Sequence, residues 1–217
     1  MSLKIVIIDY DIGNVRSIFN AFETLDIKPT LSRKKEDILS ADGVILPGVG
    51  SFPSGMKNLH KYSLVDIIKK YAQSKKPLLG ICLGMQLLFD NSEEFENTDG
   101  IGLISGVVKK LPINKEENEK LPHVSWNELI KKDIDWENTI LRSIKSKNDM
   151  YFVHSYIAIP DNQSHILSYT QYLNNEFVSS VKKDNIYGCQ FHPEKSAKDG
   201  LKILENFIKM IKEYKNV

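Results

Sequence analysis

The sequence predicts an α/β fold with an open, mostly parallel sheet flanked by helices and a second half richer in strands. Short continuous apolar runs, such as residues 4–9, are typical of strands buried on both faces. Segments with apolar residues at helical spacing alternate with these runs in the first half of the chain. This alternation predicts a parallel sheet covered by helices. In the second half, strand-like runs follow one another with little helix between them, which predicts mixed or antiparallel strands.

The elements of the first half can be assigned in order. The run at residues 4–9 leads through Gly13-Asn14 into a helix that ends near Asp26, with Pro29 beyond it. Apolar residues of that helix recur at Val15, Ile18, Phe19, Phe22 and Leu25. A strand at 43–46, a loop, a helix over 64–71, a strand at 78–81 and a helix starting near Met85 are expected to follow.

The second half contains five strand-like runs, at 101–109, 151–159, 166–172, 177–181 and 186–191. Residues 114–120 are rich in lysine and glutamate and predict a solvated loop. A last helix has Ser196 available as its cap and carries one apolar face, formed by Leu201, Leu204, Phe207, Ile208 and Ile211. Because no repeat, linker or low-complexity segment interrupts the chain, residues 1–217 are interpreted as one domain.

The composition excludes several classes of protein. Hydrophobic residues make up 41% of the 217 and charged residues 26%, values typical of a globular protein. The 29 Lys and Arg against 28 Asp and Glu give no overall reason to expect nucleic acid or a membrane as partner. Without a membrane-length apolar stretch or a signal-peptide pattern, a cytoplasmic location is expected. Two cysteines, Cys82 and Cys189, are too few for a disulfide framework or a four-cysteine zinc site, and no metal site or cofactor is expected.

Residues 80–86 have the pattern G-x-C-x-G between a predicted strand and a predicted helix. This pattern is typical of a nucleophile elbow, in which a sharp turn exposes the nucleophile and the glycines prevent clashes. The unpaired N–H groups at the start of the helix favour a Cys82 thiolate, and Leu83 N–H can face an oxyanion. The alternative is a buried core cysteine, which is the interpretation adopted for Cys189 in its strand-like run.

His192 and Glu194, in the segment His-Pro-Glu, can provide a base and the acid that orients it. Residues two apart in an extended segment point to the same side, and Pro193 favours extended geometry before it. Alone, this segment could equally be a surface turn. Together with Cys82 it predicts a Cys-His-Glu triad.

The chain resembles the class I, or triad-type, glutamine amidotransferases, and is most similar to the glutamine amidotransferase subunits of imidazole glycerol phosphate synthase. The likeness covers essentially the whole chain. It rests on six segments in the family's order, namely Asp9-Tyr10 with Gly13-Asn14, residues 47–50, residues 80–86, His123 with Trp126-Asn127, residues 151–156 and residues 190–196.

The resemblance implies a glutaminase. Cys82 would attack the side-chain amide of L-glutamine to form a thioester, His192 would protonate the departing ammonia and then activate water, and Glu194 would orient His192. Val49 and Leu83 would donate to the oxyanion, and the strand at 47–50 would rearrange when the partner is occupied. Residues implied to hold glutamine are Gly50, Gln86, Ser155 and Tyr156, with His154 as a neighbour of this pocket.

The resemblance also implies a heterodimer in which ammonia passes to a (β/α)8-barrel cyclase. That cyclase makes imidazole glycerol phosphate and aminoimidazole carboxamide ribonucleotide in histidine biosynthesis. The residues implied to face it are Asn14, Trp126, Tyr151 and Lys195, although core packing would account equally well for the two aromatic residues.

The chain departs from the family at Asp11, where glycine is usual, and at Val124-Ser125, where methionine-glycine is usual. A paralogous subunit that supplies a different synthase, such as a sugar-modifying enzyme, is therefore the alternative. A silent regulatory scaffold and another kind of cysteine hydrolase are further interpretations. The intact triad and the 47–50 loop, respectively, argue against them.

Overall fold

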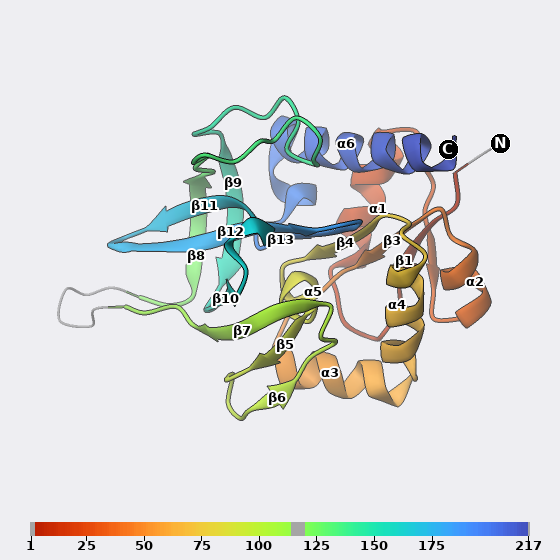
Figure 1. Cartoon of the computed structure of the whole chain (residues 1–217), viewed down its shortest axis with the longest axis horizontal. Helices are drawn as coiled ribbons and strands as arrows, with labels where there is room; N and C mark the ends of the chain where they lie inside the picture. The colour runs from red at the N-terminus through yellow and green to blue at the C-terminus, as the bar shows by residue number, and fades with distance from the viewer. Residues whose placement is uncertain (1–2, 114–119, 217) are drawn as a thin grey trace.

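The computed structural model describes residues 3–113 and 120–216 and has a seven-stranded sheet at its centre (Figure 1). The strand order is β11-β12-β13-β4-β3-β1-β2. From β13 to β2 neighbouring strands are parallel, whereas β12 pairs antiparallel with both β13 and β11. The mostly parallel sheet is thus confirmed, with its antiparallel part in the second half. The strands are β1 (Ile5–Ile8), β2 (Thr30–Ser32), β3 (Gly43–Leu46), β4 (Leu78–Ile81), β11 (Ile166–Tyr172), β12 (Asn175–Lys183) and β13 (Ile186–Cys189).

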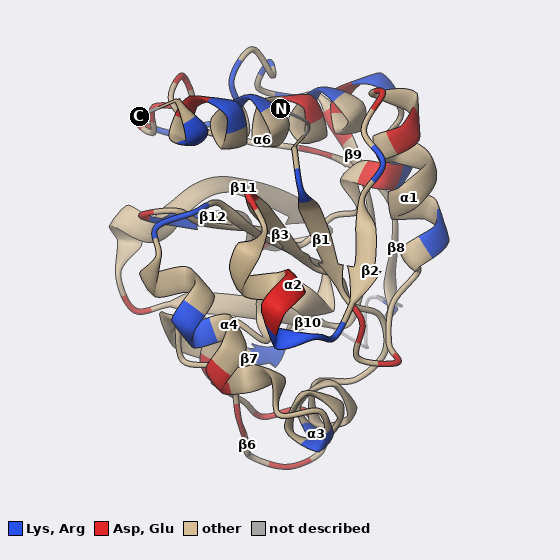
Figure 2. Ribbon diagram, turned by 90° about the vertical axis from the view of Figure 1, so that its right-hand side faces the viewer, with Lys and Arg blue, Asp and Glu red and all other residues tan. Residues whose placement is uncertain are grey.

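Helices cover both faces of this sheet (Figures 1 and 2). Helices α1 (Val15–Thr24) and α6 (Ala197–Lys215) pack on one face, and α2 (Lys35–Ser40), α3 (Phe52–Lys61) and α4 (Leu64–Gln73) pack on the other. β1, β3, β4 and β13 carry no charged residue, and most charged residues lie on helices and loops (Figure 2). β1, β3 and β4 are buried along their whole length because they lie between these two layers. Within the described ranges, no helix is long and apolar enough to cross a membrane.

Two smaller sheets extend from the second half of the chain. One has the order β10-β7-β5-β6, and the other pairs β8 with β9 in antiparallel fashion. Their strands are β5 (Phe89–Ser92), β6 (Thr98–Asp99), β7 (Ile104–Lys110), β8 (His123–Glu128), β9 (Asp149–His154) and β10 (Tyr156–Pro160), and η2 (Gln163–His165) is a short 3₁₀ turn before β11. These sheets matter for function because β9 and β10 pass beside the end of β4.

Several sequence predictions need correction. The helix expected from Met85 is a single turn, α5 (Leu83–Gln86), because the following apolar residues are buried on all sides rather than on one helical face. The predicted strand 151–159 is two strands separated at Ser155. The segments that form β2, α2, α3, β5, β6 and β8 were not predicted as elements. The loop expected at 114–120 lies, except for Lys120, outside the described residues.

Ser196 also behaves differently from expectation. It occupies the N-cap position of α6, but its side chain does not cap the helix. Its hydroxyl instead donates to the His192 carbonyl at 2.7 Å and accepts the Tyr151 N–H at 3.0 Å. Ser196 therefore ties β9 to the segment that carries His192.

Strand order brings together the two segments that carry the predicted triad. β4 and β13 are parallel neighbours, so their carboxyl ends lie at the same edge of the sheet. Cys82 follows β4, and its N–H donates to the carbonyl of Cys189, the last residue of β13, at 2.7 Å. His192 lies three positions beyond that strand end. In open α/β sheets, ligands bind outside this edge.

Candidate active site

Cys82 lies in a sharp turn between β4 and α5. Its backbone has φ 52° and ψ −112°, a conformation that side-chain-bearing residues rarely adopt and that tends to occur at functional sites. The turn is packed so closely that a Cβ added at Gly84 would lie 1.9 Å from the Leu46 carbonyl oxygen. The elbow therefore requires glycine at this position and holds the Cys82 side chain at the carboxyl end of the sheet.

The His192 imidazole is oriented by a buried carboxylate. Its Nδ1 lies 2.8 Å from Glu194 Oε1, and the two side chains are 2% and 1% exposed. The segment is not fully extended as predicted, because Pro193–Lys195 form a 3₁₀ turn, η3, after an extended His192. Burial lowers the pKa of His192, but the sulfur of Cys82 and the carboxylate of Glu194 outweigh it and raise the pKa to about 10. This environment favours a charged imidazole.

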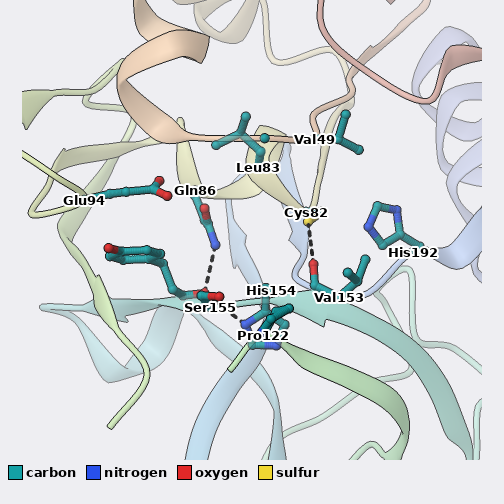
Figure 3. A pocket seen from close by; sticks show the side chains of 12 residues that line it. Val49, Cys82, Leu83, Gln86, Glu94, Pro122, Val153, His154, Ser155 and His192 are labelled. Carbon is teal, nitrogen blue, oxygen red and sulfur yellow. Dashed lines mark hydrogen bonds between the residues drawn. The ribbon is translucent and has the colours of Figure 1, made fainter. Parts of the chain in front are cut away.

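A cavity of about 300 Å³ opens beside these groups (Figure 3). It runs from Glu94 at one end, past Gln86, to Cys82 and His192 at the other (Figure 3). The residues lining it are Val49, Gly50, Cys82, Leu83, Gln86, Glu94, Pro122, Val153, His154, Ser155, Tyr156 and His192. A nucleophile with its base thus faces one end of a small cavity, and a carboxylate faces the other.

Glu94 is a buried acid that the sequence analysis did not identify. Its Oε2 accepts the Phe52 N–H at 2.7 Å, and no described lysine or arginine forms an ion pair with it. Burial raises the pKa of Glu94, and the hydrogen bond from Phe52 partly offsets this effect. The carboxylate is therefore a strong candidate to receive a positively charged group of a ligand.

The predicted oxyanion donors lie around the sulfur. Leu83 is the first residue of α5, so its N–H has no acceptor within the helix, and Val49 lines the cavity. The segment before Val49 is anchored, because the buried Tyr10 hydroxyl donates to the Pro47 carbonyl at 2.5 Å. Gly50 follows with φ 95° and has open space around its Cα. That the Val49 peptide reorients stays a prediction, and Gly50 is the neighbour whose conformational freedom would permit it.

Gln86, Ser155 and Tyr156, which the resemblance implies to hold glutamine, line the cavity. The Gln86 side-chain Nε2 donates to the Tyr156 carbonyl and to Gln190 Oε1, each at 2.9 Å. Both amide hydrogens are thus used within the protein. The Gln86 Oε1 atom remains as the acceptor that a ligand can reach.

The predicted pocket neighbour His154 is held by a second histidine. His154 Nδ1 donates to the Tyr156 carbonyl at 3.0 Å, and its Nε2 lies 3.0 Å from His123 Nδ1. Burial and the neighbouring His123 lower the pKa of His154 to about 3, so that its ring is neutral. Cys189, the other cysteine, is fully buried, and burial raises the pKa of its thiol, which fits the predicted inert role.

Three of the residues predicted to face a partner, Trp126, Tyr151 and Lys195, form a patch beside the cavity. Trp126 is 49% exposed and contacts Tyr151 edge-on, with ring centroids 5.9 Å apart. The exposed Lys195 ammonium lies 5.8 Å from the Tyr151 ring centroid, and that ring is 6.4 Å from His192. Asn14 occupies the N-cap position of α1, and its place in the partner interface stays a prediction.

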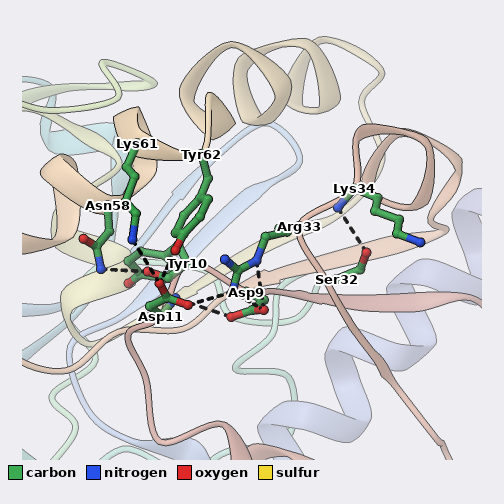
Figure 4. A network of polar contacts seen from close by, with 9 residues as sticks. All are labelled: Asp9, Tyr10, Asp11, Ser32, Arg33, Lys34, Asn58, Lys61 and Tyr62. Atoms are coloured by element: carbon green, nitrogen blue, oxygen red, sulfur yellow. Dashed lines mark hydrogen bonds and ion pairs between the residues drawn. The ribbon is translucent and has the colours of Figure 1, made fainter.

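Asp11, where the chain departs from the family, lies in a polar cluster at the end of β1 (Figure 4). Its carboxylate pairs with Arg33 at 2.7 Å and with Lys61 at 3.6 Å, and it accepts the Tyr62 hydroxyl. Arg33 also binds Asp9 at 2.5 Å. The residue has φ 62°, and these partners hold it there.

The structure adds functional candidates that sequence reasoning missed. Glu94 follows Glu93 in a polar stretch, and no sequence signal distinguishes the buried acid from the exposed one. Pro122 and Val153 line the cavity without any chemical signature. Among the described residues, no group of three or more His, Cys, Asp or Glu side chains could hold a metal ion.

The chain is similar to a known protein family and to individual proteins. The family model described as glutamine amidotransferase class-I matches residues 6–211. The imidazole glycerol phosphate synthase subunit HisH 1 of Legionella pneumophila (strain Lens) is 42% identical over 95% of this chain and 99% of its own. The HisH subunit of Lactococcus lactis subsp. lactis is 44% identical over 96% of this chain and 99% of its own. The HisH 2 subunit of Methanococcus maripaludis is 47% identical over 94% of this chain and 98% of its own.

Solved structures with a similar fold have much lower sequence identity. A glutamine amidotransferase structure superposes with a TM-score of 0.71 at 16% identity, covering 95% of this chain and 98% of its own. A chain from the PurLQS structure of Thermotoga maritima superposes with a TM-score of 0.71 at 19% identity, covering 96% of this chain and 99% of its own. At such low sequence identity, these similarities show a shared fold alone.

Proposed function

Because the chain belongs to the class-I glutamine amidotransferase family, and within it to the HisH subunits, we propose that its residues 1–217 form one glutaminase domain whose active site is the cavity at Cys82. The observation that supports this proposal most is that the two ends of the cavity differ in chemistry. A nucleophile with an oriented imidazole faces one end, and an unpaired buried carboxylate faces the other. Glutamine carries an amide at one end and an ammonium group at the other, so it matches both.

The cavity orients glutamine through its polar ends. The Glu94 carboxylate and Gln86 Oε1 accept hydrogen bonds from the ammonium group. Gly50, Ser155 and Tyr156 contact the amino-acid end of the substrate, and the side-chain amide then extends to the sulfur. Charge complementarity thus fixes the direction of the substrate before chemistry begins.

Chemistry follows from the triad. Cys82 Sγ attacks the amide carbon, and Leu83 N–H together with Val49 N–H stabilises the oxyanion of the tetrahedral intermediate. His192 protonates the nitrogen as the C–N bond breaks, which releases ammonia and leaves a glutamyl thioester. His192 then takes a proton from water, and the resulting hydroxide releases glutamate. Glu194 holds the imidazole in place throughout.

We place this glutaminase in imidazole glycerol phosphate synthase, in the cytoplasm, as a heterodimer with a (β/α)8-barrel cyclase that consumes the ammonia. The names of the relatives support this assignment. The patch of Trp126, Tyr151 and Lys195 lies next to His192 and is suited to docking the partner, because the Trp126 ring and the Lys195 ammonium are exposed there. Asn14, at the start of α1, completes the proposed interface.

A glutaminase assay of the purified chain, with and without a barrel cyclase that carries its substrate, tests the proposal. We expect slow hydrolysis alone and a strong increase with the occupied cyclase. Cys82→Ser abolishes glutamine-dependent synthesis, whereas added ammonium salt still supports the cyclase. Retention of glutamine turnover by Cys82→Ser would refute the nucleophile. An intact glutaminase that no barrel cyclase stimulates would instead indicate a different synthase as partner.

A further inference from the structure

Gln190 is a buried side chain that the proposed chemistry leaves without a role. It is fully buried between β13 and the elbow, and it does not line the cavity. Its Nε2 lies 3.8 Å from Cys82 Sγ, within the distance of a hydrogen bond to sulfur. A polar amide buried against the reacting atom needs a physical explanation.

The orientation of this amide is fixed by a backbone carbonyl. The Tyr156 carbonyl can only accept hydrogen bonds, so the Gln86 atom 2.9 Å from it must be the donor Nε2. The second hydrogen of that nitrogen points to Gln190, whose facing atom must then be the acceptor Oε1, also at 2.9 Å. It follows that Gln190 presents its N–H group, and not its oxygen, to the sulfur of Cys82.

A second buried donor, His154, binds the Tyr156 carbonyl and holds it in place. His154 Nδ1 donates to the same oxygen, and this nitrogen is its only hydrogen donor when the ring is neutral. His154 is 6% exposed and Gln86 is 5% exposed, so water does not compete freely for these bonds. The position of Gln190 is therefore set by buried partners on both sides of one carbonyl.

The titratable groups that interact with the sulfur are His192 and Tyr10. A charged His192 imidazole favours the thiolate, and the Tyr10 hydroxyl is held by the Pro47 carbonyl. The other protein atoms around the sulfur have opposite preferences for its charge. The Val153 carbonyl oxygen, 3.8 Å from Sγ, accepts a hydrogen bond from a thiol and repels a thiolate. An N–H donor favours the thiolate, because a hydrogen bond to the charged form stabilises that form. We infer that Gln190 is a further catalytic residue whose side-chain N–H stabilises the Cys82 thiolate, with Gln86 and the Tyr156 carbonyl fixing its direction. This inference rests on the proposed role of Cys82 as nucleophile.

The pH dependence of alkylation at Cys82 tests the inference without glutamine or a partner. Iodoacetamide modifies the thiolate, so the rate of labelling, followed by peptide mass analysis, reports how much thiolate is present at each pH. The variants are Gln190→Met, which keeps length but removes the donor, and Gln190→Glu, which keeps an acceptor for Gln86. The matched control is Gln163→Met, an exposed glutamine in η2.

We expect Gln190→Met to move the pH of half-maximal labelling up by about one unit, which makes labelling at lower pH about tenfold slower. Gln190→Glu moves it further, because an oxygen replaces the donor, and Gln163→Met does not move it. Should Gln190→Met fail to fold, as judged by thermal unfolding, Gln190→Glu decides the question. A labelling profile unchanged in the folded Gln190 variants overturns the inference. If Cys82 in the parent reacts no faster near neutral pH than N-acetylcysteine, the nucleophile itself is wrong, and both proposals fail.

Discussion

Replacing Glu94 with glutamine removes the charge at the far end of the cavity while keeping an oxygen that can accept the Phe52 N–H. A hydrogen bond between charged groups contributes about 1.5 to 3 kcal/mol. Since about 1.4 kcal/mol corresponds to a tenfold change, we expect KM for glutamine to rise about 10- to 150-fold. The ammonium group of glutamine does not change during hydrolysis, so kcat should change little.

The same substitution has a predicted effect on stability. Burial raises the pKa of Glu94 above its unfolded value, so the folded state loses stability as the pH rises and the carboxyl ionises. Glu94→Gln removes this cost. Thermal unfolding should therefore show the variant to be more stable than the parent at pH 8, with the difference vanishing near pH 4.

Glu93→Gln is the matched control, because this neighbouring acid is 53% exposed and pairs with Lys109. Steady-state glutaminase kinetics in the presence of the occupied cyclase, measured on the parent and both variants, provide the comparison. Glu93→Gln should behave like the parent. A normal KM in Glu94→Gln, or a loss confined to kcat, would refute the assignment of Glu94 to the ammonium group.

Three further perturbations test the rest of the site. Val49→Pro removes one proposed oxyanion donor, so it should depress the partner-stimulated glutaminase rate about 100-fold or more and leave ammonia-dependent synthesis intact; a normal response to the occupied cyclase would exclude that role. Gly84→Ala should lower the free energy of unfolding by at least about 1 to 3 kcal/mol, because the new methyl group overlaps the Leu46 carbonyl, and an unchanged thermal midpoint would contradict the packing described here. The raised pKa of His192 means that its stabilisation is complete below about pH 6.5 and is lost as the pH rises through about 10. NMR titration should show a lower His192 pKa in Cys82→Ser, since the sulfur is one cause of the shift, and an identical titration would argue against a thiolate–imidazolium pair.

The sequence predicted those parts of the site that depend on local pattern. The turn at Cys82 and the His192–Glu194 contact arise within a few residues, and each is recognisable from glycine, proline and spacing. Glu94 and Gln190 could not be predicted in the same way. Their environments are created by residues distant in the chain, Phe52 in one case and Gln86 with Cys82 in the other.

The fold shows the same division between local and distant causes. The parallel strands were predicted because each is a short apolar run buried on both faces. The length expected for the helix from Met85 was wrong, because α5 ends at Gln86. The next three residues, Leu87, Leu88 and Phe89, are all fully buried, whereas a surface helix buries only one of its faces. Their burial depends on α3 and the smaller sheet, which a local pattern does not contain.

The pairing of β4 with β13 has a consequence for how activity appears during synthesis of the chain. Cys82 and Gln190 lie 108 positions apart, and His192 is further still. The strands, helices and elbow of the first half can form from contacts near in sequence, but the base reaches the thiol only when the last strand of the sheet docks. Closing so long a loop is entropically costly and slow compared with local pairing. A partly synthesised or partly folded chain therefore holds Cys82 without its base, and the ability to release ammonia arises only with the completed molecule.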